Sequence, residues 1–406
     1  MSPARAVPAG RTPRASLAFF VAARTVSNTA YRLVYPFLPV FARSLGVGLG
    51  TMSVALAVRS AAGALGPLLA PLTDRRGRRF GLTLGLGLFA AGALLAAAGP
   101  GLAAFVAALV LMTLGKYVLD PAVLAHLSDL VPYERRGRIL AVTELSWSLA
   151  FFLGVPAAGF LVGRFGGRSP FLALAGLGLA GLVVVRTVLR LGPAADGVSG
   201  ATTAPADPAT SGYRGSYRAV LRSPAALAGI GVILAVSVSN ELVNLVFGVW
   251  LEDSFGLKLA ALGAAAAIIG AAEFAGEGLV VATVDRLGKT RALMIGLAAN
   301  AAAALVLPLA GRTEAGALAG LAVFYLTFEY TVVSMLPVMS EVLPRARATL
   351  LAFYAAAFSL GRAAGSLLSA KLYGLGFGAV TLAAFALNAV AFLFLIRLHR
   401  LTDGAR

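Results

Sequence analysis

Long apolar stretches, separated by short polar clusters, make up most of this chain. Most of the stretches are 20 to 29 residues long, and a helix needs about 20 mainly apolar residues to cross the hydrocarbon core of a bilayer. They lack the alternation of apolar and polar residues that marks the strands of a membrane barrel. The pattern therefore predicts twelve transmembrane helices, at approximately 16–43, 50–73, 80–99, 102–128, 138–163, 170–191, 224–252, 258–284, 290–310, 314–342, 347–374 and 376–398.

The polar stretch between the sixth and seventh spans is longer than the others. It is rich in Gly, Pro, Ala and Thr and has no apolar periodicity, which predicts a flexible linker. We therefore expect an all-α membrane protein with an N-terminal six-helix bundle at 1–191, a cytoplasmic linker at 192–223 and a C-terminal six-helix bundle at 224–406.

The two halves repeat each other in sequence. Polar residues and a proline of the first half return after 211 or 212 positions, with Asn28 returning as Asn240, Asp74 as Asp285, Asp129 as Glu341 and Pro132 as Pro344. Such a register indicates a duplicated unit and two pseudo-symmetric bundles. A binding site is then expected between the bundles.

The distribution of charged residues predicts how the chain is oriented in the membrane. The chain is 59% hydrophobic and only 13% charged, yet its net charge is +17. Of its 34 Lys and Arg residues, 22 lie in the tails and in alternate loops, and only 6 lie in the other loops. By the positive-inside rule, we expect a multi-pass protein of the cytoplasmic (inner) membrane with both termini cytoplasmic. This distribution argues against a nucleic-acid partner.

The sequence offers no chemistry of catalysis. There is no cysteine, and we find no nucleophile, catalytic triad or metal-binding cluster. A GLGLAG segment lies inside the sixth span without a preceding strand, so it is interpreted as helix packing rather than nucleotide binding. We therefore expect no enzyme activity, no cofactor and no metal.

The loop after the second span carries the most specific motif. It reads LTDRRGRR, and it resembles the G-x-L-a-D-r-x-G-r-k signature of the major facilitator superfamily, with Ala70 in place of the first glycine. The resemblance implies a gating loop, in which an acid and several bases pair in one conformation and separate in another. The residues concerned are Asp74, Arg75, Gly77 and Arg78, with Asp285, Arg286 and Gly288 in the second half. Topological anchoring alone would explain the arginines but not Asp74 or Gly77.

Two further features resemble this family. Lys116 lies near the position in the fourth span where family members often carry an arginine linked to proton transfer. The segment FFLGVPAAGFLVG in the fifth span partly matches a Gly/Pro motif of the family's drug:proton antiporters, which favours export.

Eight charged residues lie near the centres of predicted spans. A charge at mid-bilayer costs about 2.5 to 3.5 kcal/mol on insertion scales, so these residues are expected to face the protein interior. The four of these residues in the first half carry a net charge of +2 and the four in the second half −2, which predicts complementary faces across a central cavity. The residues are Arg32, Arg59, Lys116, Asp120, Glu241, Glu273, Glu329 and Arg362.

Polar residues at helical spacing predict the lining of that cavity. They are Arg24, Asn28, Tyr31, Arg32 and Tyr35 on the first span, Asn240 and Asn244 beside Glu241 on the seventh, and Tyr325 on the tenth. The alternative is that the Asn and Tyr side chains only join neighbouring helices, at about 0.6 kcal/mol each.

Buried carboxylic acids are the candidates for proton coupling. Removed from water, a carboxyl group can bind and release a proton near neutral pH. The first candidates are Glu241 and Glu329, and the next are Glu273 and Asp120. A nearby Arg362 or Arg32 is expected to trigger release of the proton by competing for the charge. Lys116 and Asp120, one turn apart, are expected to pair. Permanent ion pairs without a proton role are the alternative.

Together these features predict a secondary active transporter that works by alternating access. We expect proton-coupled export of a small molecule by a monomer in the lipid bilayer. One alternative is uptake or facilitated exchange of a sugar or organic anion, with Arg24 and Arg32 as ligands. A second alternative, from another class, is a non-transporting membrane receptor or sensor.

Overall fold

The computed structural model describes residues 13–69, 76–129, 142–187 and 213–403, and all regular elements in them are helical. The N-terminal bundle holds α1 (Pro13–Arg32), α2 (Leu38–Leu45), α3 (Leu49–Gly63), α5 (Arg78–Ala98), α6 (Gly101–Asp129), α8 (Val155–Phe165) and α9 (Ser169–Thr187). The C-terminal bundle holds α11 (Pro224–Phe255), α12 (Leu259–Leu287), α13 (Lys289–Ala310), α14 (Glu314–Val342), α15 (Arg347–Tyr373) and α16 (Phe377–Asp403).

Eleven helices in the described ranges are long and apolar enough to cross a membrane. Segments α1 and α2 occupy the place of the remaining predicted span. The all-α membrane architecture expected from the apolar stretches is therefore confirmed, with span ends that differ from the prediction by a few residues.

The first predicted span is not one continuous helix. It breaks into turns at residues 33–37, between α1 and α2. Pro36 lies in this break, and proline has no N–H to continue a helical ladder. The backbone of the break packs against Gly248 of α11, where an added Cβ would lie 2.6 Å from the carbonyl oxygen of Pro36. The break therefore brings the two bundles into close contact.

The fifth span, Val142–Phe165, contains a π-helical segment at Ala150–Gly154 just before α8. Pro156 follows it and lacks the N–H that would complete regular α-helical bonding. A π-bulge rotates the residues before it relative to those after it. It therefore decides which side chains of the segment 144–151 face the other bundle.

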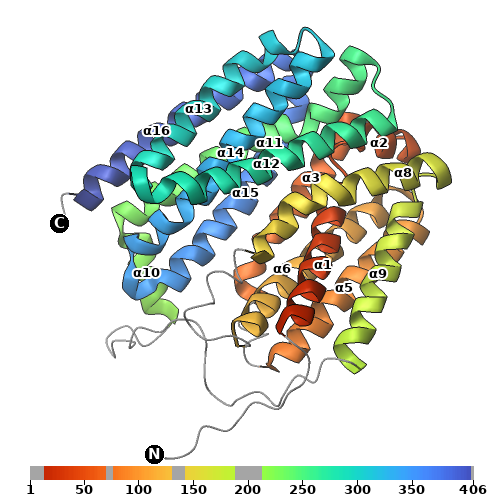
Figure 1. The fold of residues 1–406 in the computed structure, drawn as a ribbon, viewed down its shortest axis with the longest axis horizontal. Coiled ribbons are helices and arrows are strands. Elements are labelled where there is room, and N and C mark those ends of the chain that lie inside the picture. The colour runs from red at the N-terminus through yellow and green to blue at the C-terminus, as the bar shows by residue number, and fades with distance from the viewer. Residues whose placement is uncertain (1–12, 70–75, 130–141, 188–212, 404–406) are drawn as a thin grey trace, which may run out of the picture.

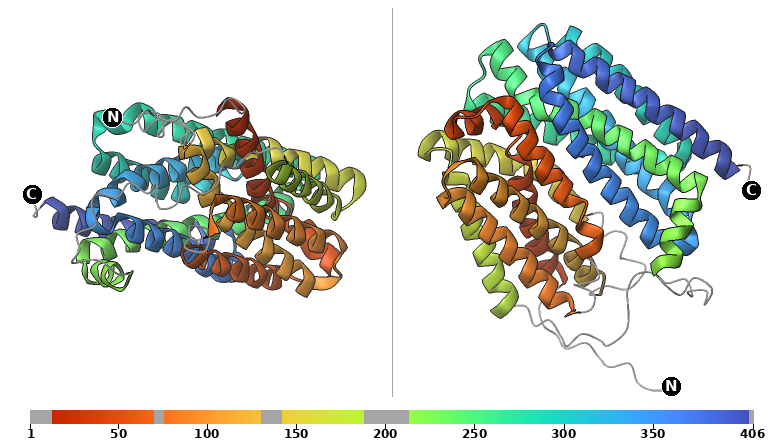
Figure 2. Two further views of the ribbon diagram at one scale, coloured as in Figure 1. Left: turned by 90° about the horizontal axis from the view of Figure 1, so that it is seen from below. Right: turned by 180° about the vertical axis from the view of Figure 1, so that it is seen from behind.

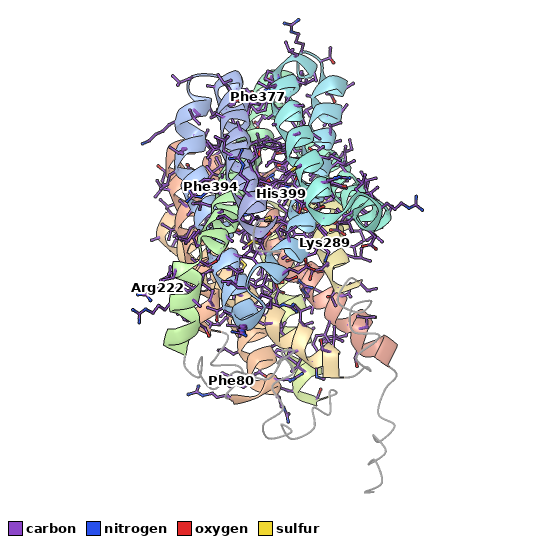
Figure 3. All side chains as sticks on the ribbon, turned by 90° about the vertical axis from the view of Figure 1, so that its left-hand side faces the viewer. Phe80, Arg222, Lys289, Phe377, Phe394 and His399 are labelled. Carbon is purple, nitrogen blue, oxygen red and sulfur yellow. The ribbon has the colours of Figure 1, made fainter. Side chains whose placement is uncertain are left out.

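The prediction of a flexible linker at 192–223 is wrong for its last part. Residues Tyr213–Arg222 form α10, which packs on α11 and α15. Val220 is fully buried, and the ring of Tyr217 meets Phe353 edge-to-face at 5.3 Å. Arg222 is exposed and projects outward (Figure 3). The hydroxyl of Ser223 then accepts a hydrogen bond from Ala226 N–H and caps α11.

The two bundles lie side by side, close together at one end and further apart at the other (Figures 1 and 2). We call the end where α1 and α10 begin and α16 finishes the terminal face. The other end, with the links after α2, α8, α11 and α15, is the opposite face. The bundles meet along two related seams, where α3 packs on α15 and where α8 and the π-helical segment pack on α12. Each seam pairs the second span of one half with the fifth span of the other half, so pseudo-symmetry relates the two seams to each other.

Candidate functional site between the bundles

The ion pair of Arg32 and Glu273 joins the bundles at mid-height. The two guanidinium nitrogens of Arg32 lie 2.6 and 2.5 Å from the two carboxylate oxygens of Glu273, and both side chains are almost fully buried. The same guanidinium lies over the rings of Phe151 and Trp147, at 3.5 and 4.3 Å from their centroids. Bidentate geometry and aromatic contacts make this the most completely satisfied charge contact between the halves.

A second network centres on Tyr35, which lies in the break after α1. Its hydroxyl accepts hydrogen bonds from Arg59 at 2.6 Å and from Arg362 at 3.1 Å, and it donates to the carboxylate of Glu241 at 3.1 and 3.2 Å. Arg362 also contacts Glu241 directly at 3.0 Å. We call these four residues the Tyr35 network. It takes two residues from each bundle.

The carboxylate of Glu241 has further donors. Ser366 donates at 2.8 Å and the Asn244 amide at 3.3 Å. The Asn244 carbonyl in turn accepts from Tyr325 of α14 at 2.8 Å. Sequence predicted each of these residues except Ser366, which lies one turn after Arg362 on the same helix face.

A third cluster lies inside the N-terminal bundle. Arg24 bridges Asp120 at 3.2 Å and Glu144 at 3.0 Å, and Lys116 binds Asp120 at 2.5 Å. The expected pairing of Lys116 with Asp120 is therefore present. Glu144 of the fifth span thus has Arg24 of the first span as its partner.

Two acids near these clusters have no cationic partner among the described residues. Glu329 of α14 is 7% exposed and has neither a hydrogen bond nor an ion pair there. Glu277 of α12 accepts only from Ser148 of the other bundle, at 2.7 Å. Gly276 lies against α14, since a Cβ added to it would lie 3.3 Å from Cβ of Glu329. The two acids are therefore neighbours.

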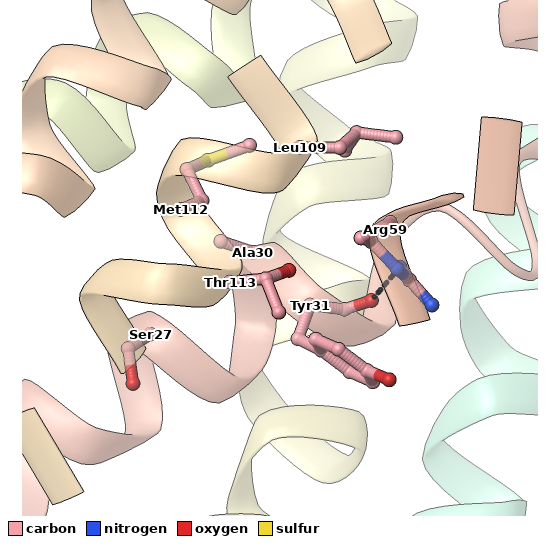
Figure 4. A pocket seen from close by; sticks show the side chains of 7 residues that line it. All are labelled: Ser27, Ala30, Tyr31, Arg59, Leu109, Met112 and Thr113. Atoms are coloured by element: carbon pink, nitrogen blue, oxygen red, sulfur yellow. Dashed lines mark hydrogen bonds between the residues drawn. The ribbon is translucent and has the colours of Figure 1, made fainter. Parts of the chain in front are cut away.

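The remaining predicted polar residues have mixed positions. The Asn28 amide donates to Ser146 at 3.2 Å within its own bundle. The Asn240 amide nitrogen is buried without an acceptor in the part of the chain that the structure describes. Tyr31 contributes its backbone carbonyl, which accepts from Arg59 at 2.8 Å (Figure 4).

The two loop motifs share one backbone feature. Gly77 and Gly288 precede α5 and α13 with φ of 84° and 83°, a region that favours glycine. Arg78 donates to the carbonyl of Ala125 in α6. Asp285 and Arg286 lie in the last turn of α12, whereas Asp74 and Arg75 lie outside the described residues. The expected pairing of acid and bases in the first loop stays a prediction.

Sequence reasoning did not identify Trp147, Phe151, Ser148 or Ser366 as contacts of the charged residues. Phe151 lies in the π-helical segment, and Trp147 and Ser148 lie just before it. The apolar pattern does not reveal how this segment rotates the helix. Pro156 was the available signal for it, because a proline inside a span perturbs helical bonding.

Comparison with known proteins agrees with this architecture. The model of the Major Facilitator Superfamily matches residues 20–336. The uncharacterized MFS-type transporter YwfA of Bacillus subtilis is 26% identical over 362 residues, which cover 89% of this chain and 86% of that protein. Multidrug resistance protein 2 of the same organism is 26% identical over 159 residues, 39% of this chain and 40% of that one.

Solved structures share the fold at low identity. The peptide transporter POT in complex with sulfate superposes with a TM-score of 0.74 at 16% identity, covering 98% of this chain and 97% of that one. The human organic anion transporter MFSD10 gives a TM-score of 0.68 at 18% identity, covering 95% and 100%. With a family match over most of its length and two bundles joined by a pair of pseudo-symmetric seams, this chain belongs to the Major Facilitator Superfamily of membrane transporters for small molecules.

Proposed function

We propose that this protein is a proton-coupled secondary active transporter that exports a small amphipathic molecule by alternating access. In this proposal it lies in the cytoplasmic membrane as a monomer, with the terminal face in the cytoplasm. The orientation rests on the basic residues, since Arg218, Arg222, Arg286, Arg345 and their neighbours gather at that face.

The contacts between the bundles support alternating access with the opposite face closed. They run from the Arg43–Glu252 ion pair near that face, at 2.6 Å, through the Tyr35 network to the Ser148–Glu277 hydrogen bond at mid-height. Toward the terminal face the bundles diverge (Figure 1), and the side chain of Glu144 is 57% exposed although it lies in a membrane span. In this proposal a substrate enters from the cytoplasm in this conformation.

Glu329 carries the proposal of proton coupling. It is buried, and neither a base nor a hydrogen-bond donor contacts it among the described residues. A carboxyl group in such a place is stable only when protonated or when a cation arrives. Glu241, by contrast, is held by Arg362, Tyr35, Ser366 and Asn244. We therefore propose Glu329 as the first candidate for proton binding and Glu277 as the second. In this proposal Glu241, Glu273 and Asp120 form ion pairs that exchange partners when the bundles move relative to each other.

The alternative of organic-anion uptake assigned Arg24 and Arg32 as ligands. Both guanidiniums already contact carboxylates in this conformation. An anionic substrate would have to displace those carboxylates, which favours the export proposal over this alternative. A receptor without transport would bind ligand but show no counterflow.

Proton movement in proteoliposomes tests the proposal. We would measure it with a pH-sensitive dye while adding cationic drugs, sugars and organic anions, and compare Glu329→Gln with Glu314→Gln, a control on the exposed start of the same helix. We expect one compound class to move protons in the native protein and in Glu314→Gln but not in Glu329→Gln. Substrate flux without proton flux would refute coupling and indicate a facilitator.

A further inference from the structure

Helix α10 keeps one side exposed after it has packed on the C-terminal bundle. Val220 is fully buried on the packed side, whereas Tyr217 is 36% and Leu221 56% exposed. Arg218 and Arg222 are exposed as well. Residues four apart share one face of a helix, so this side carries an apolar stripe of Tyr217 and Leu221 beside a basic stripe of Arg218 and Arg222. We call these four residues the α10 surface.

The α10 surface lies where a membrane span begins. The span α11 starts at Pro224, two residues after α10 ends. Ser223 between them has an extended backbone, with φ of −88° and ψ of 110°, so α10 does not continue the axis of the span. In Figure 2, α10 lies at the outer edge of the C-terminal bundle, on the side away from the N-terminal bundle. Leu227, one turn into the span, is 45% exposed. The α10 surface therefore borders lipid rather than the gap between the bundles.

The arginines at this end of the bundle have no acid to balance them. Helix α10 packs against the 3₁₀ turn Pro344–Ala346 and the start of α15, which add two exposed arginines. No Asp or Glu occurs at 213–240 or 342–372, and Glu341, just before the second stretch, already contacts Lys289. Four exposed arginines thus lie here without an ion pair among the described residues, namely Arg218, Arg222, Arg345 and Arg347.

We propose that the α10 surface binds the headgroup of an anionic phospholipid of the adjoining leaflet, such as phosphatidylglycerol. Guanidinium groups donate charge-assisted hydrogen bonds to phosphate oxygens, often two at a time. Tyr217 and Leu221 would contact the glycerol backbone and the upper acyl chain, as the apolar face of an interfacial helix does. A zwitterionic lipid carries its own cation beside the phosphate, so a group of unbalanced arginines favours a lipid with net negative charge.

This inference goes beyond the proposed transport function, because the lipid is neither cargo nor a coupling ion. None of the four residues takes part in the contacts between the bundles. The bound lipid would hold α10, and with it the start of α11, at the membrane surface. The inference stands whether or not Glu329 binds a proton, and its test does not measure transport.

Quenching of a fluorophore on α10 by labelled lipids tests the inference. The chain has no cysteine, so Leu221→Cys can carry a single bimane label in the full chain. We would place it in phosphatidylcholine nanodiscs that contain a small fraction of lipid with a nitroxide near the top of its acyl chain. The nitroxide is on phosphatidylglycerol in one sample and on phosphatidylcholine in the other. We expect the labelled phosphatidylglycerol to quench several-fold more strongly, and the difference to shrink at high salt.

Removal of charge from α10 should abolish this preference. In the labelled chain, Arg218→Gln with Arg222→Gln should bring the two lipids close to equal quenching, since each arginine contributes up to about fivefold at a membrane surface. The control Arg76→Gln with Arg186→Gln removes two exposed charges from the terminal face of the other bundle and should leave the preference intact.

The outcomes that would overturn the inference are specific. Equal quenching by the two lipids in the chain with all its arginines would exclude a preference for anionic lipid. A preference that survives the loss of both α10 arginines would place the lipid elsewhere. Quenching by neither lipid would show that the surface faces water or another protein. Native mass spectrometry of the unlabelled chain from mixed micelles gives a check without the label, with phosphatidylglycerol expected to remain bound in preference to phosphatidylcholine.

Discussion

Arg32 and Glu273 show how much a single pair of side chains contributes to the contact between the bundles. Their contact is buried, bidentate and supported by two aromatic rings. The exposed pair Arg43–Glu252 also joins the bundles, but its side chains are 62% and 27% exposed. Solvent and ions screen the second pair and leave the first almost unscreened.

Arg32→Gln is therefore expected to destabilise the closed conformation strongly, by about 3 to 5 kcal/mol, because Glu273 is left buried without its base. Arg43→Gln is expected to cost only about 0 to 1 kcal/mol. Denaturant unfolding of both variants in detergent gives the comparison, and the double change Arg32→Gln with Glu273→Gln should recover part of the loss. Equal effects of Arg32→Gln and Arg43→Gln would contradict this account.

The sequence predicted which residues are buried better than it predicted their partners. The cost of charge in a membrane was enough to place Arg32, Glu273 and Arg59 in the interior. Their pairings depend on how each helix is rotated about its axis, which the apolar pattern does not determine. Arg24 illustrates this, since it was predicted to line the cavity and its guanidinium instead contacts Asp120 and Glu144 within its own bundle.

At the scale of helices, the predictions were right for features that depend on the length of an apolar stretch. They were wrong for features that depend on local backbone geometry. The span limits followed from hydrophobicity. The break at 33–37 and the π-helical segment follow from local backbone geometry near Pro36 and Pro156, which an average over a span conceals. Helix α10 was missed because only ten residues form it, and its surroundings are rich in Gly and Pro.

The turn before α13 provides a test at this scale. Gly288 has φ of 83° and nothing lies within 4 Å of an added Cβ, so any effect of Gly288→Ala comes from the backbone alone. We expect a loss of about 1 to 3 kcal/mol. Gly278→Ala, inside α12 with the same free space, should be neutral or stabilising by up to about 1 kcal/mol. Thermal unfolding of both variants measures the difference, and equal midpoints would refute it.

For the whole molecule, the proposed mechanism requires the contacts at the opposite face to open in every cycle. The chain contains no cysteine, so introduced pairs can be cross-linked without background reactions. Arg43→Cys with Glu252→Cys places two thiols on helices of different bundles that meet at this face.

A short bifunctional maleimide is expected to link this pair and to stop transport in proteoliposomes. Either single cysteine variant, treated in the same way, should keep its activity. Gel mobility reports the extent of linking and substrate flux reports the cycle. Full transport after complete linking would show that the opposite face does not need to open at this point.

The hydroxyl of Tyr35 has one proton and its lone pairs, and all are engaged by Arg59, Arg362 and Glu241. None is left for a water molecule, so this hydroxyl cannot be a link in a chain of hydrogen-bonded water. If protons drive the cycle as proposed, the Tyr35 network would then act as an electrical insulator as well as a connection between bundles. We expect a Tyr35→Phe variant, which frees Arg59, Arg362 and Glu241 from this hydroxyl, to leak protons in empty proteoliposomes.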